Sequence, residues 1–197
     1  MKVYNFSPGP AKLDSSIISK SQEAMYNFQN TGLSILEIGH RSKEFEKLMN
    51  SLQENIRNIF NVPTNYFTLF LQGGATFQNT FIANNFDKRD KDLGCLVTGT
   101  WGKNTFDDFS KIRETKLIEL SQDEIENFVE SGEDLKNVDY LHLTSNETIN
   151  GVQLREFNKI NHDSLLIDMS SDIGSYRFEW DNIAYIYAGA QKNMGIP

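Results

Sequence analysis

A single lysine, Lys192, stands among small residues in the stretch YAGAQKNMGIP (187–197). An apolar run ends just before this turn, so we expect the lysine to lie beyond the end of a β-strand. Its small neighbours leave room around the side-chain nitrogen, and burial there would favour an uncharged, nucleophilic amine that can form a Schiff base. The alternative is an exposed surface lysine, which is the commoner role for this residue type.

A glycine pair follows an apolar run in LFLQGGATFQNTF (69–81) and precedes a helical pattern. Glycines allow a tight turn, and the free N–H groups at a helix N-terminus attract phosphate. Ala75 and Thr76 would present those N–H groups. The stretch contains neither GxxxxGK[ST] nor GxGxxG, and a turn without a ligand explains it equally well.

Two further residues could contact a ligand at the edge of a sheet. Asp168 closes the apolar run LLIDMSS (165–171) at the expected carboxyl end of a strand, where open α/β sheets bind ligands. It could instead form a turn or cap a helix. Trp101, in TGTWGKN (98–104), is either a stacking surface or a core anchor for the next helix.

Polar residues also gather in two other loops. Residues 146–148 follow another apolar run and precede an Asn150-Gly151 turn, and they could be a polar loop with no further role. His40 and Arg41 precede a helix that starts near Ser42. An arginine there can bind a carboxylate or phosphate in bidentate fashion, or it is solvated.

Pyridoxal phosphate requires the combination that these segments offer: a phosphate loop, an aromatic surface, an acid for the ring nitrogen and a lysine for the aldehyde. Metal catalysis has less support, because the three histidines show no ligand spacing such as HExxH. The sequence also lacks the GxSxG motif of a nucleophile elbow.

Short β-rich runs alternate with helical patterns along the chain, which predicts an α/β fold with a mostly parallel central sheet flanked by helices. The expected strands are 66–72, 95–99, 115–120, 138–144, 164–170 and 183–189. Helical spacing covers 45–59 and 77–82, and Ser121 with Glu124 forms a capping-box pattern. No linker or repeat interrupts the sequence, so we expect one domain over 1–197.

Composition limits the classes of partner. The chain has 197 residues, 39% of them hydrophobic, and a formal net charge of -8. This acidity argues against nucleic acids and anionic membranes, which bind clustered Lys and Arg. Cys95 has no second cysteine to pair with, and neither a signal peptide nor a membrane-spanning run is present, so we expect a reducing, cytoplasmic location.

Seven motifs in this sequence resemble those of one enzyme family. They are NFSPGPA (5–11), GHRSKEF (39–45), QGGAT (72–76), TW (100–101), NETINGVQ (146–153), DMSSDI (168–173) and YAGAQKNMG (187–195). Together, and in this order, they are similar to the phosphoserine aminotransferases, class V aminotransferases that bind pyridoxal 5'-phosphate in the aspartate-aminotransferase fold (fold type I).

The resemblance implies roles for residues around the cofactor ring. Lys192 would form the Schiff base and act as general base and acid during catalysis. Asp168 would keep the pyridine nitrogen protonated, Trp101 would stack on the ring, and Thr148 would hydrogen-bond the phenolic oxygen.

It also implies roles at the phosphate and the substrate. The backbone N–H groups of Ala75 and Thr76 would bind the cofactor phosphate with help from Gln191. Arg41 would bind the substrate carboxylate, and His40 is a candidate for the substrate phosphate. Relatives often carry Gly and Arg or Cys where this chain has Ala75 and Thr76, so the side-chain contribution of such an Arg is absent.

The reaction implied is amino transfer from L-glutamate to 3-phosphohydroxypyruvate, giving 2-oxoglutarate and O-phospho-L-serine in serine biosynthesis. The same family serves pyridoxine biosynthesis by accepting phosphorylated hydroxythreonine, and its members are homodimers. The residues alone leave open a related fold-type I enzyme, such as an alanine–glyoxylate aminotransferase or a cysteine desulfurase, and a non-catalytic remnant that binds the cofactor or a partner.

Family members continue beyond the lysine into the rest of the large domain and a smaller C-terminal domain. We therefore expect residues 1–197 to be a cofactor-binding large domain, incomplete at its C-terminal end and without the small domain. A second chain could supply the remainder of a cleaved or split protein. Alone, residues 1–197 are expected to be weakly active or inactive.

Overall fold

The computed structural model describes residues 3–86, 92–131, 135 and 137–196. They fall into two compact units, Met1–Phe70 with Gly195–Pro197, called here the N-terminal unit, and Leu71–Met194, called the sheet unit. Each unit is described by itself. The expectation that 1–197 form a single cofactor-binding domain remains a prediction.

The N-terminal unit is helical. Its elements are α1 (Ser15–Tyr26), η1 (Phe28–Asn30), η2 (Ile35–Glu37) and α2 (Lys43–Phe60). α2 starts where the hydroxyl oxygen of Ser42 accepts the backbone N–H of Phe45 at 3.2 Å, and it ends at Asn61 in the left-handed conformation. The helix predicted over 45–59 is therefore confirmed.

The strand predicted over 66–72 is wrong, because these residues form an irregular segment. Side chains of α2 bond its backbone carbonyls: Gln53 Nε2 donates to the oxygen of Thr68 at 3.1 Å, and Arg57 donates to that of Tyr66. Phe67 remains 90% exposed. A strand needs a neighbouring strand for its backbone groups, and here side-chain donors satisfy two of its carbonyls instead.

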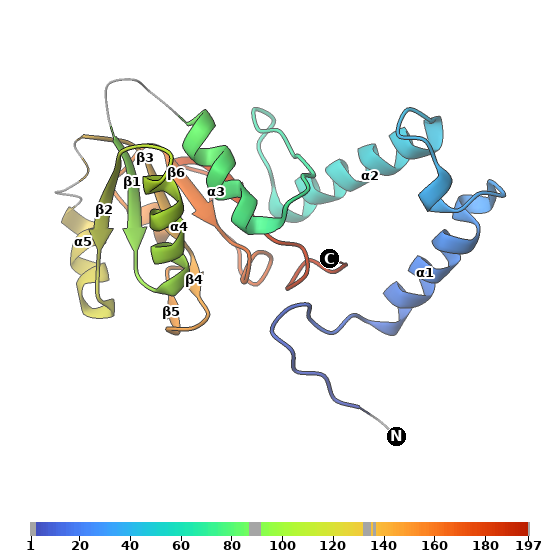
Figure 1. Ribbon diagram of the computed structural model, residues 1–197, viewed down its shortest axis with the longest axis horizontal. Coiled ribbons are helices and arrows are strands. Elements are labelled where there is room, and N and C mark those ends of the chain that lie inside the picture. Colours follow the sequence, from blue (N-terminus) through green and yellow to red (C-terminus); the bar gives the residue numbers. More distant parts are fainter. Residues whose placement is uncertain (1–2, 87–91, 132–134, 136, 197) are drawn as a thin grey trace. The chain divides into compact units, whose positions relative to one another are not determined.

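The sheet unit is built on five parallel strands in the order β2-β1-β3-β6-β7 (Figure 1). Their bounds are β1 (Asp92–Val97), β2 (Thr115–Glu119), β3 (Val138–Thr144), β6 (Leu165–Asp168) and β7 (Ile183–Tyr187). A two-stranded antiparallel hairpin joins β4 (Asn146–Glu147) to β5 (Val152–Gln153). The expected α/β fold with a mostly parallel sheet is confirmed.

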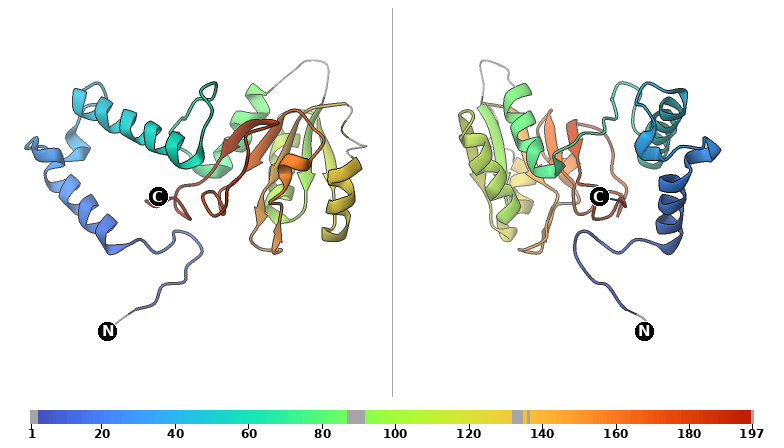
Figure 2. Two further views of the ribbon diagram at one scale, coloured as in Figure 1. Left: turned by 180° about the vertical axis from the view of Figure 1, so that it is seen from behind. Right: turned by 45° about the vertical axis from the view of Figure 1, so that its right-hand side comes forward.

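Helices cover both faces of this sheet. The bounds are α3 (Gly74–Asn85), α4 (Thr100–Ser110), η3 (Gln122–Glu124), α5 (Ile125–Ser131) and η5 (Phe157–Lys159). α3 and α4 pack on one face, and the view from behind shows η5 on the other (Figure 2). The predicted capping box of Ser121 and Glu124 is present at η3.

Strand register decides which side chains share a face. Along β6, Leu165 and Ile167 belong to the core under α5 and η5, whereas Leu166 belongs to the core under α3 and α4. Alternation therefore places Asp168 on the α3/α4 face, at the carboxyl end of its strand. The next strands continue the row, since Asp168 pairs in register with Thr144 of β3 and Tyr187 of β7.

The strand order also identifies the edge of the sheet at which a ligand would bind. From β1 the chain passes to β2 on one side, and β3 returns to the opposite side of β1. Such a reversal opens a crevice beyond the carboxyl ends of the strands. Val97, Thr144, Asp168 and Tyr187 are the terminal residues of the four strands β1, β3, β6 and β7.

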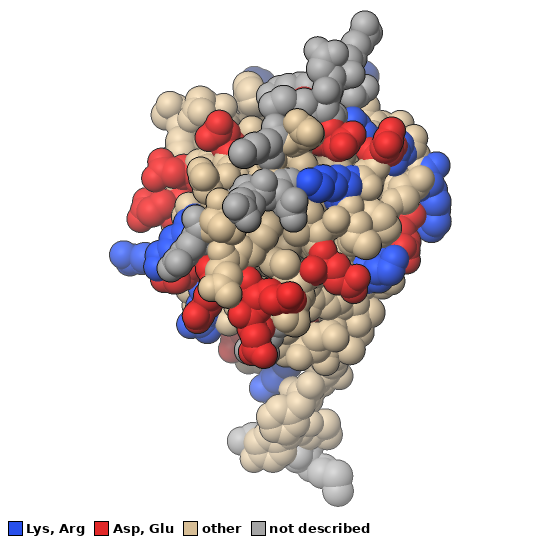
Figure 3. Space-filling view, turned by 90° about the vertical axis from the view of Figure 1, so that its left-hand side faces the viewer, with Lys and Arg blue, Asp and Glu red and all other residues tan. Residues whose placement is uncertain are grey.

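The charged side chains are mixed in sign on the face that Figure 3 shows, where blue basic and red acidic groups alternate among tan residues. Within the described residues, no helix combines the length and the apolar character needed to cross a bilayer, and no cluster of three or more His, Cys, Asp or Glu side chains could hold a metal ion.

Candidate active site

Lys192 and Trp101 lie together at the carboxyl edge of the sheet. The Nζ of Lys192 is 5.6 Å from the centroid of the indole ring, and the lysine side chain is half-buried. Trp101 is 39% exposed. The indole is therefore no core anchor, and of the two roles considered for Trp101 the structure favours a surface on which another group can stack.

Two hydrogen bonds hold Trp101 in place. Its indole Nε1–H donates to the hydroxyl oxygen of Thr148 at 2.9 Å, and its backbone N–H donates to Glu147 Oε2 at 2.8 Å. The structure thus places Thr148 and Lys192 on either side of one contact residue, Trp101, while their roles at a cofactor remain predictions. Thr148 itself is exposed and lies in the turn between β4 and β5.

The β4–β5 hairpin supplies the N-terminal cap of α4. Glu147 is fully buried, and its Oε1 accepts the N–H of Gly102 at 2.6 Å in addition to the bond from Trp101. Asn150 Oδ1 accepts the N–H of Thr100 at 2.8 Å. A Cβ at Gly99 would lie 2.7 Å from the Glu147 side chain, so only glycine fits at this helix start.

The side chain of Asp168 caps a backbone turn, and the residue also lies at the carboxyl edge of the sheet. Its Oδ1 accepts the N–H of Ser170 at 2.8 Å, which fixes the carboxyl group. Burial raises the pKa of Asp168, while the bonds from Ser170 and the positive charge of Lys192 oppose that rise. A buried carboxyl group in these surroundings can carry a negative charge when a cationic group lies close to it.

The start of α3 presents free N–H groups. Gly73 and Gly74 have positive φ angles of 97° and 64°, and no side chain caps the helix. The first helical N–H groups, among them those of Ala75 and Thr76, have no intrahelical partner. This terminus contrasts with that of α4, where Glu147 and Asn150 occupy the equivalent positions.

Gln191 lies in the turn after β7. A Cβ at Gly189 would come within 2.7 Å of Gln191 Oε1, so the glycine lets this side chain fold back against the backbone. The N–H of Gly189 donates to Ser170 Oγ at 3.1 Å. This bond ties the turn that carries Lys192 to the turn that follows Asp168.

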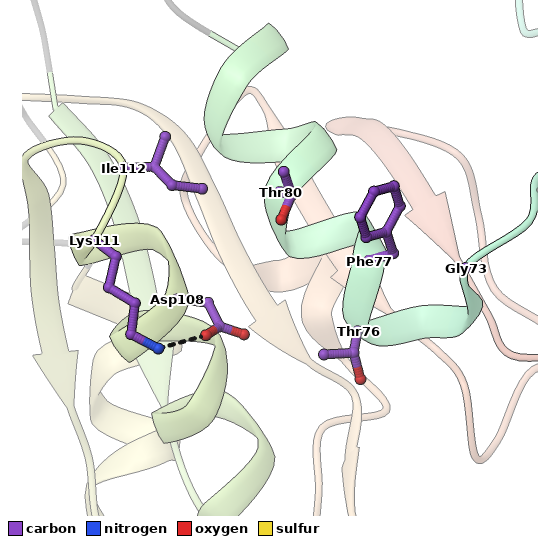
Figure 4. Close-up of a pocket in the computed structure, with 7 residues that line it drawn as sticks. All are labelled: Gly73, Thr76, Phe77, Thr80, Asp108, Lys111 and Ile112. Atoms are coloured by element: carbon purple, nitrogen blue, oxygen red, sulfur yellow. Dashed lines mark hydrogen bonds and ion pairs between the residues drawn. The ribbon is translucent and has the colours of Figure 1, made fainter.

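A small open pocket of about 330 Å³ lies between α3 and α4 (Figure 4). It is lined by Gly73, Thr76, Phe77, Thr80, Asp108, Lys111 and Ile112. It shares Gly73 and Thr76 with the start of α3, but neither Lys192 nor Asp168 lines it. The acidic and the basic side chain that line the pocket form an ion pair, in which Lys111 Nζ lies 2.9 Å from Asp108 Oδ1.

Two buried hydroxyls at the sheet edge have no hydrogen-bond partner in the described part of the chain: Thr98 Oγ1 after β1 and Thr144 Oγ1 at the end of β3. Thr144 is the register neighbour of Asp168. Unpaired buried polar groups are rare in folded proteins, and a bound polar ligand at this edge would give them partners. The residues present therefore fit a ligand with a phosphate, an aromatic ring and a basic ring nitrogen.

Sequence reasoning missed a buried polar pair beneath the edge. His142 Nε2 lies 3.0 Å from the hydroxyl of Tyr187, and both residues are buried. Burial lowers the pKa of His142 to about 3, which keeps the imidazole neutral. The signal was present in YLHLT, where Tyr140, His142 and Thr144 alternate with leucines and so share one face of β3.

The two candidate substrate residues lie in the N-terminal unit. Arg41 and His40 are exposed in the turn before α2. Lys192 belongs to the sheet unit, and the roles of Arg41 and His40 remain predictions.

Comparison with known proteins gives the class. A family model described as aminotransferase class-V matches residues 3–197, so the chain belongs to this family. It is 40% identical to a phosphoserine aminotransferase of Geobacillus kaustophilus (strain HTA426) over 98% of its own length and 54% of the relative.

Solved structures agree with this assignment. The phosphoserine aminotransferase of Bacillus circulans subsp. alkalophilus superposes with a TM-score of 0.89 at 35% identity, covering 99% of this chain and 55% of that one. A pyridoxal-phosphate-bound phosphoserine aminotransferase from Trichomonas vaginalis gives 0.84 at 30% identity, covering 99% and 59%. The chain spans about half the length of the curated relatives it matches. The resemblance drawn from the seven motifs is confirmed.

Proposed function

We propose that this chain carries the cofactor-binding and catalytic lysine of a phosphoserine aminotransferase. The observation that supports this most directly is the convergence of Lys192, Trp101 and Asp168 at the carboxyl edge of a parallel sheet. Relatives bearing that name are 36 to 40% identical over 98% of the chain, which supports the same activity.

The residues at the edge would hold pyridoxal 5'-phosphate as follows. The uncapped N–H groups of Ala75 and Thr76 would bind its phosphate, with Gln191 contributing from the turn after β7. Trp101 would stack on the ring and Thr148 would hydrogen-bond its phenolic oxygen. Asp168 would pair with the ring nitrogen.

When bound, the cofactor supplies an aldehyde that accepts an amino group and a ring that takes up electrons from the substrate. Lys192 would hold the cofactor covalently and, once displaced by the substrate amine, move the proton from the substrate Cα. The anionic Asp168 would favour the protonated ring nitrogen, which strengthens the ring as an electron acceptor.

The substrates proposed are L-glutamate as amino donor and 3-phosphohydroxypyruvate as acceptor. The amino group leaves glutamate, which becomes 2-oxoglutarate, and arrives on the keto acid, which becomes O-phospho-L-serine. Arg41 is the proposed carboxylate ligand and His40 a candidate phosphate ligand. Phosphorylated hydroxythreonine is a second candidate substrate.

We also infer that the working enzyme is a homodimer in the cytoplasm. The chain covers 54 to 56% of the length of its relatives. This coverage supports a site that also needs groups from outside residues 1–197. The missing groups would come from further residues, from a second chain or from a partner subunit. The unpaired, buried Cys95 is compatible with a reducing compartment.

Absorbance spectroscopy tests the proposal. Pyridoxal phosphate added to the purified protein should give a visible band from the covalently attached cofactor. L-glutamate alone should remove the band with stoichiometric release of 2-oxoglutarate, and 3-phosphohydroxypyruvate should restore it. A band that glutamate leaves unchanged would favour a non-catalytic, cofactor-binding protein, and conversion by alanine but not glutamate would favour a related aminotransferase.

A further inference from the structure

We propose that Asn79 is a positioning residue for the cofactor phosphate. Its buried side-chain amide fixes α3 between β7 and α4, and so determines where the first N–H groups of that helix lie. The inference rests on the proposed function for its ligand, whereas the hydrogen bonds that carry it belong to the chain itself.

The buried face of α3 is partly polar. Its buried side chains are those of Gln78, Asn79, Ile82 and Ala83. Two of these four are amides, and Asn79 is only 5% exposed. Apolar side chains could fill this face without directional contacts, whereas a buried amide is costly unless its oxygen and its nitrogen find partners. The helix therefore needs polar partners at defined positions on its neighbours.

Both ends of the Asn79 amide have such a partner. Its Nδ2 donates to Asp108 Oδ2 of α4 at 3.1 Å, and its Oδ1 accepts the hydroxyl of Tyr187 of β7 at 3.3 Å. An ionised carboxylate can only accept, so Asp108 fixes which end of the amide faces α4. The carboxylate is itself held, because it pairs with Lys111 beside the pocket (Figure 4).

His142 holds the phenol at the other end of this chain of bonds. The one hydrogen of the Tyr187 hydroxyl is donated to Asn79, so its oxygen must accept from His142 Nε2, 3.0 Å away. The imidazole packs edge-on against Phe109, with ring centroids 5.3 Å apart, and both rings are buried. The hydrogen bonds then run in one direction, from the imidazole through the phenol and the amide to the carboxylate. A fully satisfied network of this kind favours one arrangement of its elements.

A second amide of α3 makes a similar contact. The hydroxyl of Tyr185 donates to Gln78 Oε1 at 2.7 Å. Tyr185 and Tyr187 are two positions apart on β7 and so share one face, which means that the strand holds α3 at two successive residues. Of the two amides, Asn79 also reaches α4, and it therefore locks the helix to both neighbours.

The position of Asn79 connects this lock to the proposed site. It lies one helical turn after Ala75, so a tilt of α3 at Asn79 would move the N–H groups of Ala75 and Thr76 that are proposed to bind the phosphate. Tyr187 ends β7, and Lys192 lies in the turn that follows. The amide thus fixes the phosphate end of the site relative to the strand that leads to the lysine.

The first test compares two ligands that differ only in the phosphate. Asn79→Leu keeps a similar side-chain volume and removes both hydrogen bonds. Affinity for pyridoxal 5'-phosphate should fall about tenfold, the cost of one weakened bond to a charged group, while affinity for pyridoxal should stay within about twofold. Absorbance titrations measure both. A merely structural role would lower the two affinities equally, so equal losses, or no loss, would overturn the inference.

Asn84→Leu is the matched control for this variant. It makes the same change on the same helix, but Asn84 is exposed, and its Nδ2 donates to the carbonyl of Thr80 within α3 at 2.7 Å. Both affinities should stay at the wild-type values. A selective loss for pyridoxal 5'-phosphate in this control as well would overturn the role of Asn79.

A second pair of variants serves if Asn79→Leu fails to fold in urea titrations. Asp108→Leu and Asp108→Asn remove the same charge, but only the asparagine keeps an oxygen that can accept from Asn79. The affinity for pyridoxal 5'-phosphate relative to pyridoxal should be about threefold lower in Asp108→Leu than in Asp108→Asn. Equal ratios in the two variants would overturn the inference.

A measurement without cofactor separates the inference from the proposed function. Inorganic phosphate should shift the ¹H–¹⁵N signals of Ala75 and Thr76, with an affinity about tenfold lower in Asn79→Leu and unchanged in Asn84→Leu. That result in a protein that never forms a visible band with pyridoxal phosphate would contradict the proposed function and support the inference. Signals that do not respond in wild type, or that respond equally in Asn79→Leu, would overturn the inference even in an active enzyme.

Discussion

The indole N–H of Trp101 donates to the hydroxyl of Thr148 at 2.9 Å, and this bond fixes the aromatic ring beside Lys192. The donor starts α4 and the acceptor lies in the β4–β5 turn, so one hydrogen bond joins two separate elements at the edge of the sheet.

The first prediction concerns this bond. Thr148→Val keeps the side-chain shape but removes the hydroxyl. The indole then loses the acceptor that orients it, and the phenolic oxygen of the cofactor loses its proposed hydrogen-bond partner. Affinity for pyridoxal phosphate should fall about tenfold, the cost of one to two hydrogen bonds. Thr148→Ser should restore most of it. Equilibrium dialysis measures the affinities, and equal values for Thr148→Val and wild type would contradict the role of Thr148.

The second prediction concerns the cap of α4. Glu147→Gln replaces one of two accepting oxygens by a donor that faces a backbone N–H. The free energy of unfolding should fall by about 2 kcal/mol, as for a lost helix cap with a buried unpaired group. Urea unfolding measures it. Glu156→Gln, in an exposed pair with Lys159, is the control and should leave it unchanged; equal stability of both variants would contradict the cap.

The third prediction concerns pH. Burial lowers the pKa of His142 to about 3, below its ordinary value of 6.5. As pH falls, His142 therefore binds a proton in the unfolded chain before it does so in the folded protein. The stabilisation that comes from the neutral ring is complete above pH 6.5 and is lost as pH falls toward 3. Between pH 6.5 and 5 the free energy of unfolding should drop by about 2 kcal/mol from this residue.

His142→Gln isolates that contribution. The pKa of Asp168 is raised by burial, so its contribution to the free energy of unfolding changes with pH in the opposite direction, and the pH dependence of the wild type alone is a mixture. Urea unfolding at pH 7 and at pH 5 gives the change in the free energy of unfolding with pH for each protein. The difference between this change in wild type and in His142→Gln is the contribution of the histidine. Parallel slopes would show that the ring is protonated in the folded protein.

The fourth prediction concerns residues 1–197 alone. They hold the proposed cofactor residues but only about half the length of the matched relatives. We expect cofactor binding with turnover at least about 100-fold below that of a full-length relative, because substrate positioning and water exclusion would be incomplete. Steady-state assay beside the Geobacillus kaustophilus relative measures it, and comparable turnover would contradict this expectation.

The sequence was sufficient to predict the elements that hold the site. Asp168 closes an apolar run that is a strand, and Lys192 follows another, so local pattern alone placed both at the sheet edge. The glycine pair before Ala75 was likewise visible, because a positive φ at Gly73 and Gly74 restricts the residue type.

Other features depend on contacts that sequence pattern does not carry. The segment 66–72 has strand composition, but side chains of α2 bond two of its carbonyls. Tyr187 and His142 are 45 positions apart, and only strand register brings them together. In the sequence, Glu147 is part of a polar loop. Its role as a cap becomes visible only when the structure shows the start of α4 bonded to it.

The most direct test of the central claim is to locate the cofactor on the chain. Borohydride reduction of the protein with pyridoxal phosphate should fix the cofactor covalently, and peptide mass spectrometry should find it on Lys192. Lys192→Ala should show no modified peptide and no visible band. Stoichiometric labelling of another lysine in wild type, or an unchanged band in Lys192→Ala, would contradict the account.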